Sequence, residues 1–464
     1  MTADRPLSLG WSSRIAASLT IGFAAVVAMW VAWFLLNLPS VSTSVPHAVS
    51  GLLILLVAAA VLLVGCCRTP HADRVVVGLI AGFVAGLVNL LALGTQLTSP
   101  TADGAAAPGS SGLKPDAWLI VVCFLAVMAA AGLVAGFGAR SLGGARERRT
   151  PASWLASFAL VNAVAILPLL TLGGLVTSAK AGFAVPDWPG TYGANMFLYP
   201  IALMSEPRIF LEHSHRLFGT MVGTTTLVGF VFALCCAPKG WMKLAATGLL
   251  LLVIAQGVAG GYWTQEKSRL YVIAHAVVGQ VYFALSCAYA AGLSERWARW
   301  RADTAARATT PTPRTGIIVL LALLFVQLVM GTMVRHPGAK GGNHALFTHI
   351  GLSAVIVLLA IIVGTKMMRL KQTPVHGKSL WLAGHAPMVI VGLQFLLGWV
   401  AFLVWQANPS VAAPLSHELA SAESIKPLDV LVRTAHQANG ALLLGASAVM
   451  AVWGLAGLAS RRGT

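Results

Sequence analysis

Four histidines recur at one place in the later part of the sequence, where a loop runs into an apolar stretch: His215, His275, His349 and His436. An imidazole inside a membrane is costly unless it is paired or ligated. A single histidine here is explained equally well by a hydrogen bond to a loop carbonyl, whereas four in register favour a shared function. Haem iron takes one imidazole from each side, so two pairs of facing histidines predict two haem sites. Zinc is disfavoured because cysteine and carboxylate ligands do not gather at these positions.

One of the two predicted sites carries an additional acid. Glu212 precedes His215 by three residues, so both lie on one side of the helix start, whereas Leu346 holds the matching position before His349. A carboxylate in an apolar pocket can accept or donate a proton. The structural alternative is that Glu212 caps the helix N-terminus, where negative charge is favourable. Arg216 is expected either to pair with a haem propionate or to extend to the membrane interface.

The helices that position these histidines show an internal repeat. A Gln-x-x-x-Gly motif precedes three of them, and the glutamine is replaced in the fourth: Gln256 and Gly260, Gln327 and Gly331, Gln394 and Gly398, and Leu169 and Gly173. Residues four apart share one helix face, so the glycine would let a flat ring approach the backbone while the glutamine faces the bundle. The repeat predicts two four-helix halves, each with two facing histidines.

The composition places these elements in a membrane. Of the 464 residues, 57% are hydrophobic and 10% are charged, and the mean hydropathy is +0.81, which excludes an ordinary soluble domain. Apolar runs of about 20 residues can cross a bilayer. We therefore predict an all-α polytopic membrane protein with twelve transmembrane helices, at about 14–38, 48–67, 74–97, 117–139, 154–177, 214–236, 244–263, 271–291, 315–335, 347–365, 379–404 and 434–459.

The basic residues indicate orientation and do not indicate a nucleic-acid partner. The net charge of +17 is distributed in short clusters between apolar runs. With both termini in the cytoplasm, 21 of the 31 Lys and Arg residues fall on the cytoplasmic side. Arg5 and Arg14 precede a long apolar run that lacks a clear cleavage site, which favours a retained first helix.

The chain divides into segments by composition. Residues 1–150 are predicted to form a four-helix membrane extension of unknown role, in which Gly78, Gly82 and Gly86 form a stripe suited to close helix packing. The predicted eight-helix core consists of residues 151–295, with one predicted haem site, a basic cytoplasmic linker at 296–314, and residues 315–464, with a second haem site. The six cysteines lie in or beside apolar runs, so a disulfide framework is not expected.

Several motifs together resemble the haem A synthase family, the Cox15/CtaA membrane proteins, over essentially all of residues 151–464. They are Leu172 to Ser178, Ala184 to Pro189, Asn195 to Phe197, Glu212 to Gly219 with Val222 and Gly223, His275-Ala276, Thr348-His349 and Ala435 to Gln437. The four N-terminal helices lie outside this resemblance. Some family members carry a cysteine pair in the first outward loop, and its absence between Gly173 and Glu212 places a dithiol-dependent step in doubt.

The resemblance implies an oxidoreductase that acts on a CH3 group. Haem O would be the substrate, held between His215 and His275, and its ring methyl would be oxidised to the formyl group of haem A through hydroxylated intermediates. Haem b would be the cofactor, held between His349 and His436, and Glu212 matches the catalytic carboxylate. The product would serve cytochrome oxidase in a bacterial-type cytoplasmic membrane. The expected partners are haem O synthase, oxidase assembly factors, an electron acceptor and the lipid bilayer.

Two other classes of protein share parts of this pattern. A dihaem b electron-transfer protein would need the same four histidines but not Glu212. A solute transporter would also suit twelve helices with a repeat, but transporters place polar groups near the midplane. Here the midplane is apolar and the polar groups gather at one surface, which favours haem chemistry over transport.

Overall fold

The computed structural model describes residues 10–100, 111–144, 146–266, 268–336, 343–407 and 424–456. In this part of the chain the elements are helices, apart from strands β1 (Thr98–Pro100) and β2 (Ser111–Leu113), which pair antiparallel. The predicted all-α class is therefore confirmed for the described residues. The longer helices are α1 (Trp11–Leu36), α3 (His47–Cys66), α4 (Arg74–Leu93), α5 (Ala117–Leu142), α6 (Pro151–Ser178), α7 (Pro207–Cys236), α8 (Gly240–Glu266), α9 (Arg269–Leu293), α12 (Arg314–Arg335), α13 (Asn343–Met368), α14 (Gly377–Ala407) and α16 (Pro427–Gly454).

Shorter segments connect these helices. They are α2 (Pro39–Ser42), η1 (His71–Asp73), η2 (Gly94–Gln96), η3 (Met196–Leu198), η4 (Ile201–Met204), α10 (Glu295–Ala302), α11 (Thr304–Thr309) and η5 (Arg369–Gln372).

Eleven helices among the described residues are long and apolar enough to cross a membrane, which confirms a polytopic membrane protein. The twelfth predicted span corresponds to α16, which is not among the eleven. Its first four turns carry Asp429, Arg433 and Asn439, and these polar side chains lower its hydropathy. The twelve-span count and the repeat of two halves remain predictions.

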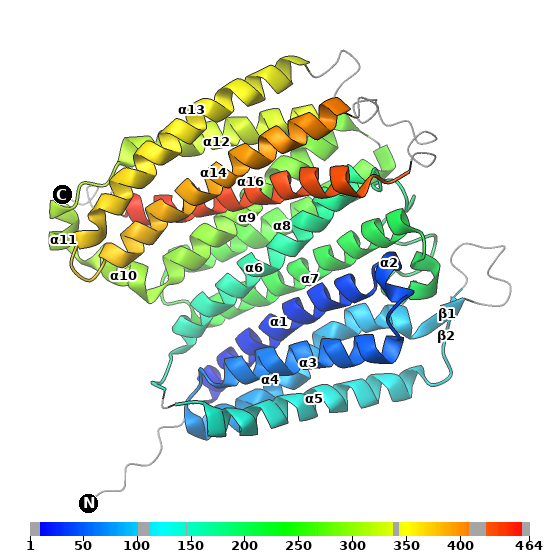
Figure 1. The fold of residues 1–464 in the computed structure, drawn as a ribbon. Coiled ribbons are helices and arrows are strands. Elements are labelled where there is room, and N and C mark those ends of the chain that lie inside the picture. Colours follow the sequence, from blue (N-terminus) through cyan, green and yellow to red (C-terminus); the bar gives the residue numbers. More distant parts are fainter. Residues whose placement is uncertain are drawn as a thin grey trace, which may run out of the picture. The chain divides into compact units, whose positions relative to one another are not determined.

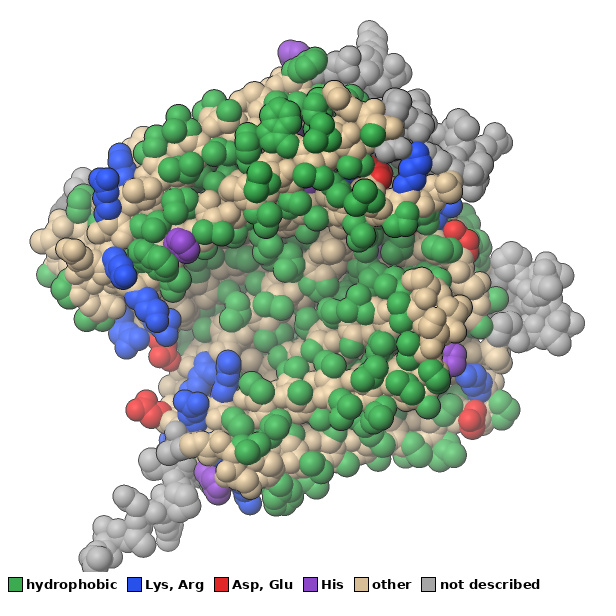
Figure 2. Space-filling model, viewed as in Figure 1, with side chains coloured by type: hydrophobic (Ala, Val, Ile, Leu, Met, Phe, Trp, Pro, Cys, Tyr) green, Lys and Arg blue, Asp and Glu red, His purple; other side chains and the backbone are tan. Residues whose placement is uncertain are grey.

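Hydrophobic side chains cover the visible sides of the helices, and Lys and Arg lie toward their ends (Figure 2). On α5, for example, Trp118 is 76% exposed and Leu119 is 64% exposed. Large apolar side chains with this exposure are expected where a helix faces lipid.

The chain forms two compact units, Met1–Leu169 with Gly182–Thr247, and Leu170–Ala181 with Gly248–Thr464. Helices α6 and α8 each begin in the first unit and end in the second. The four predicted segments, with boundaries at residues 150, 295 and 314, follow the sequence repeat and remain a prediction.

The first unit contains a four-helix bundle made of α1, α3, α4 and α5 (Figure 1). In this bundle α1 packs against α3 and α4, and α5 also packs against both. The predicted glycine stripe lies at the contact of α4 and α5. A Cβ added at Gly78 would lie 2.3 Å from the carbonyl oxygen of Gly132, and one at Gly82 would lie 2.2 Å from that of Met128. The two backbones touch, so the predicted close packing is confirmed.

We expect Gly82→Ala to destabilise the first unit by about 1–3 kcal/mol, because the new methyl group must separate two backbones that are in contact. Thermal unfolding of the purified protein in detergent measures this change. Gly51→Ala is the matched control, since its Cβ would meet no atom within 4 Å in the described structure. If both variants unfold at the wild-type temperature, the contact between α4 and α5 is not as close as described.

A buried arginine closes one end of the same bundle. Arg74 is fully buried, and its guanidinium donates hydrogen bonds to the carbonyl oxygens of Thr69, Ala139, Gly143 and Gly144 at 2.5 to 3.2 Å. A buried charge is tolerated when its donors are satisfied in this way. Arg74 therefore links the start of α4 to the end of α5.

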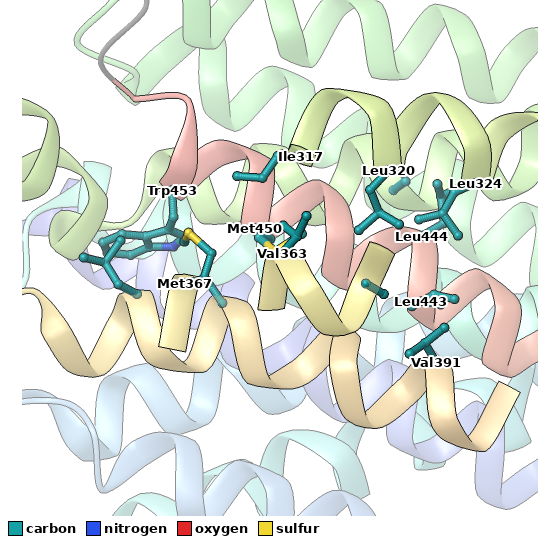
Figure 3. Packing of buried hydrophobic residues seen from close by; sticks show 14 of the residues in the cluster. Ile317, Leu320, Leu324, Val363, Met367, Val391, Leu443, Leu444, Met450 and Trp453 are labelled. Carbon is teal, nitrogen blue, oxygen red and sulfur yellow. The ribbon is translucent and has the colours of Figure 1, made fainter. Parts of the chain in front are cut away.

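The second unit is centred on α12, α13, α14 and α16, each of which packs against the next, while α16 also packs against α12. Their buried side chains form one hydrophobic cluster (Figure 3). Ile317 and Leu320 of α12 meet Met450 of α16 and Val363 of α13, and these side chains are 3% exposed or less. Helix α9 packs against α16 and α12 from outside this group. These helices form a rigid frame for the histidines that they carry.

Candidate functional site

The helix that carries Glu212 and His215 begins earlier than predicted. Helix α7 starts at Pro207, and the Glu206 side chain accepts a 2.7 Å hydrogen bond from the Ile209 amide. Proline in the first turn and an acidic N-cap are both favourable at a helix start. Glu206 is therefore the cap, and the capping alternative for Glu212 is wrong. Glu212 and His215 lie in the second and third turns, and the prediction that they lie in the first turn is also wrong.

Glu212 is buried and joins α7 to the preceding loop. Its Oε2 accepts a 2.9 Å hydrogen bond from the Val185 amide, and its Oε1 accepts one of 2.7 Å from Nη2 of Arg216. The same guanidinium donates to the carbonyl oxygens of Val185, Asp187 and Gly190. The loop containing Pro186, Asp187, Trp188 and Pro189 is thus held on α7 by one ion pair. A propionate contact of Arg216 would have to compete with these bonds.

Further polar contacts give this loop a fixed shape. The Asp187 carboxylate accepts hydrogen bonds from the amides of Tyr192 and Gly193 at 2.7 and 2.9 Å, where both residues have positive φ. These two bonds close the segment from Asp187 to Gly193 on itself. The Tyr192 hydroxyl donates to the carbonyl oxygen of Ala184. The loop is therefore a preorganised platform beside Glu212.

His213 is a structural residue of the same platform. It is fully buried, its Nδ1 lies 3.1 Å from the Thr191 hydroxyl, and its ring lies 5.5 Å from that of Tyr199. Burial raises the pKa of Tyr199 to about 12, and nearby Tyr192 and Asp187 add to this. The phenol therefore stays neutral. The motif Glu212-His213-Ser214-His215 thus carries two histidines with different surroundings.

We expect Arg216→Lys to loosen the loop at residues 182–206, because a single ammonium group cannot replace a planar guanidinium that reaches three carbonyls and a carboxylate. The expected loss of stability is about 1–3 kcal/mol, the range for hydrogen bonds to charged groups. Limited proteolysis of the loop is the measurement, and Arg140→Lys at an exposed position is the control. Equal cleavage rates in the two variants would contradict the role given to Arg216.

His215 lies on a face of α7 that small residues leave open. Gly219 and Gly223 follow it at intervals of four, and a Cβ at either glycine would meet no atom within 4 Å in the described structure. Residues four apart share a helix face. The face that carries His215 therefore has room beside it in the first unit.

In the second unit, the glycine of each Gln-x-x-x-Gly motif lies against an imidazole ring. A Cβ added at Gly260 would lie 3.1 Å from Cε1 of His275, one at Gly331 would lie 2.9 Å from Cε1 of His349, and one at Gly398 would lie 3.2 Å from Cε1 of His436. The sequence predicted that a flat ring approaches these glycines. The flat ring found there is the imidazole itself, in all three copies of the motif in this unit.

The glutamines of the motif lie beside the same rings. Nδ1 of His275 lies 3.1 Å from the carbonyl oxygen of Gln256, and Nδ1 of His349 lies 3.2 Å from that of Gln327. When Nδ1–H donates to a carbonyl, Nε2 keeps its lone pair and can bind a metal. At His436 the direction is reversed, because the side-chain amide nitrogen of Gln394 lies 3.2 Å from Nδ1 and donates to it. Asn439 donates to the oxygen of that amide at 2.8 Å.

The structure brings His349 and His436 together. Their ring centres are 6.3 Å apart and their planes are inclined by 80°. When two imidazoles bind one metal ion from opposite sides at about 2.0–2.1 Å each, their ring centres are about 6 Å apart. His215 belongs to the first unit and His275 to the second. The surroundings of each histidine are those of its own unit.

Arg335, which lies in a basic cluster at the end of α12, was not predicted. Arg335 donates to the Gly174 carbonyl at 2.8 Å and to the Ser178 hydroxyl at 2.5 Å, and Arg433 donates to Asp429 at 2.7 Å. Burial lowers the pKa of the adjacent His336 to about 4, helped by Arg335 and Arg269, so this imidazole is neutral. The sequence held a signal for Arg335, which follows Gly331 by four residues and so shares the face of the motif.

Comparison with known proteins agrees with this site. A family described as cytochrome oxidase assembly protein, COX15-CtaA, matches residues 156–341. Over these residues the chain is similar to the COX15-CtaA family. The matched region contains Glu212, His215 and His275, while His349 and His436 follow it. The family predicted from the sequence motifs is therefore confirmed.

Two relatives bear the name Heme A synthase. One, from Symbiobacterium thermophilum, is 25% identical over 274 residues, which is 54% of this chain and 88% of the relative. The other, from Beijerinckia indica subsp. indica, is 27% identical over 237 residues, which is 43% of this chain and 61% of the relative. No solved structure matches the chain. The COX15-CtaA region is thus shared, and the N-terminal bundle lies before it.

Proposed function

We propose that this chain is a haem A synthase, which oxidises the ring methyl group of haem O to the formyl group of haem A through hydroxylated intermediates. The family match over residues 156–341 carries this proposal, because it includes the loop, Glu212 and two of the four histidines. The two relatives named Heme A synthase support it. The product would serve the assembly of cytochrome oxidase in a bacterial-type cytoplasmic membrane.

The proposed cofactor is haem b, and His349 and His436 would be its axial ligands. Among the described residues, no three His, Cys, Asp or Glu side chains gather as a metal centre. Haem suits such a pair because the porphyrin supplies four nitrogens and needs only two imidazoles from the protein. The 6.3 Å between the ring centres and the carbonyl beside Nδ1 of His349 support this assignment. When bound, haem b would carry single electrons from the substrate site to an acceptor.

The residues around this pair would orient the cofactor. Gly331 and Gly398 leave room for the two rings, and Gln327 and Gln394 set their orientation. Arg335 and Arg433 place two positive charges beside one carboxylate, Asp429. An anionic propionate would be favoured next to this excess of positive charge.

The proposed substrate is haem O, with His215 and His275 as its ligands. Two observations within the separate units support this proposal: His215 lies on an open face of α7, and Nδ1 of His275 lies beside a carbonyl oxygen. Glu212 would accept the protons that leave the substrate methyl group as it is oxidised. The Val185 amide of the loop and the Arg216 guanidinium of α7 each donate to one of its oxygens and hold this carboxylate in place.

The proposal is tested by expression in a host that makes haem O but lacks its own synthase, followed by extraction and identification of the haems. We expect haem A to appear. Purified protein that binds haem and leaves haem O unchanged would indicate a dihaem b electron-transfer protein. Protein without a haem absorbance band would indicate transport and would reject both. Haem O synthase would be the partner that supplies the substrate, and haem b would deliver electrons to a separate acceptor.

A further inference from the structure

Helix α7 has two faces with different neighbours, both within the first unit. Phe210, Leu217, Phe218 and Met221 are each 1% exposed or less. At about 100° per residue they fall within one arc of about 100°. Glu212 and Gly219 point to the opposite side of the helix. The candidate site therefore occupies one face of α7, and the other face is buried in hydrophobic packing.

The N-terminal bundle supplies this packing through α1. The ring centres of Trp30 and Phe218 are 5.5 Å apart at 82°, and those of Phe34 and Phe210 are 5.4 Å apart at 20°. Phe34 also contacts Phe218, at 6.2 Å. Phe210 and Phe218 lie on either side of Glu212 and His215 along α7. Edge-to-face and stacked pairs are directional, so they fix both the rotation and the height of a helix.

The same bundle also holds the loop that precedes α7. A Cβ added at Gly94, directly after α4, would lie 2.2 Å from the carbonyl oxygen of Phe197. The Thr98 hydroxyl donates a 2.8 Å hydrogen bond to the carbonyl oxygen of Leu198. Phe197 and Leu198 precede Tyr199, whose ring packs against His213. The bundle thus contacts α7 from the helix side, and the segment directly after α4, with Gly94 and Thr98, contacts the loop.

We propose that the N-terminal four-helix bundle positions the α7 site, with Trp30, Phe34, Gly94 and Thr98 as the positioning residues. The rotation of α7 sets the direction of Glu212, and the loop supplies the Val185 amide that the carboxylate accepts from. None of these four residues touches the substrate side of the helix. The inferred effect of the bundle on the reaction rests on the proposed haem A synthase activity. The placement of α7 itself does not depend on that activity.

The experiment compares Phe34→Ala with the conservative Phe34→Leu in the full-length protein. Hydrogen–deuterium exchange followed by mass spectrometry reports local order in peptides from residues 184–216 and, separately, from α12 to α16. We expect Phe34→Ala to speed exchange in the first region only. Because a displacement of about 1 Å can cost up to about 100-fold in rate, haem A formation should fall by about 10-fold to 100-fold. The pH dependence of haem A formation should also change. Phe34→Leu should restore both the exchange rate at residues 184–216 and the rate of haem A formation.

Gly94→Ala provides a second variant that acts through the loop and should give the same local change. Trp118→Ala, at a 76% exposed position on α5, is the control in the same bundle and should change neither readout. Unchanged exchange at residues 184–216 in both Phe34→Ala and Gly94→Ala would overturn the proposal. Faster exchange throughout the chain would also overturn it, because the bundle would then serve general folding. Local exchange changes in a protein that makes no haem A would support the placement of α7 and reject the proposed function.

Discussion

Replacing His349 with alanine is expected to remove the haem b that we propose for the second unit. Loss of partners outside the ligand shell already costs metal affinity by about 10–100-fold, and loss of an axial ligand should cost more. His436→Ala should give the same result, since its ring centre lies 6.3 Å from that of His349. Haem content per protein, from the absorbance of the extracted pyridine complex, is the measurement.

The matched control for this prediction is His344→Ala. His344 is exposed and lies on the same helix, five residues before His349. It should leave the haem content unchanged. Retention of haem b with an unaltered spectrum in both His349→Ala and His436→Ala would show that these imidazoles do not bind iron.

Replacing Glu212 with glutamine is expected to lower haem A formation by about 100-fold to 10,000-fold, the usual contribution of a positioned proton acceptor. Glutamine has nearly the same shape, and its amide oxygen can still accept from the Val185 amide. The variant therefore removes the proton acceptor and its charge but keeps a link to the loop. Haems extracted from cells that supply haem O measure the effect.

Two further variants separate catalysis from loop support. Glu206→Gln changes an exposed carboxylate that caps the same helix, and it should leave haem A formation near the wild-type level. Glu212→Ala removes both the proton acceptor and the loop contact. If Glu212→Gln is active and Glu212→Ala is inactive, Glu212 only holds the loop, and the proton must be accepted elsewhere.

Patterns that depend on helix periodicity could be predicted from the sequence. The stripe of Gly78 and Gly82 lies at a helix contact, and the glycines of the Gln-x-x-x-Gly motif lie against histidine rings. Both depend on residues four apart sharing a face, which holds for any helix. The glycine that follows three of the four histidines by four residues, such as Gly279 after His275, was visible in the sequence but was not recognised.

Features that depend on contacts between distant segments could not be predicted. Arg216 was expected to reach a propionate or the membrane interface, but it binds three loop carbonyls that precede it by 26 to 31 residues. Phe34 contacts Phe210 far along the chain, so no local pattern shows that the N-terminal bundle meets α7. The start of α7 was misplaced because the apolar run begins after its capping residue, Glu206.

Arg74 has a consequence for how this protein is made. Its guanidinium is fully buried, and three of the carbonyls that satisfy it, those of Ala139, Gly143 and Gly144, belong to the end of α5 and the residues just after it. A growing chain that has inserted α1, α3 and α4 therefore holds a cation without most of its acceptors. Translation must continue past residue 144 before this guanidinium has all of its acceptors, and α7, which begins at Pro207, follows later in the chain.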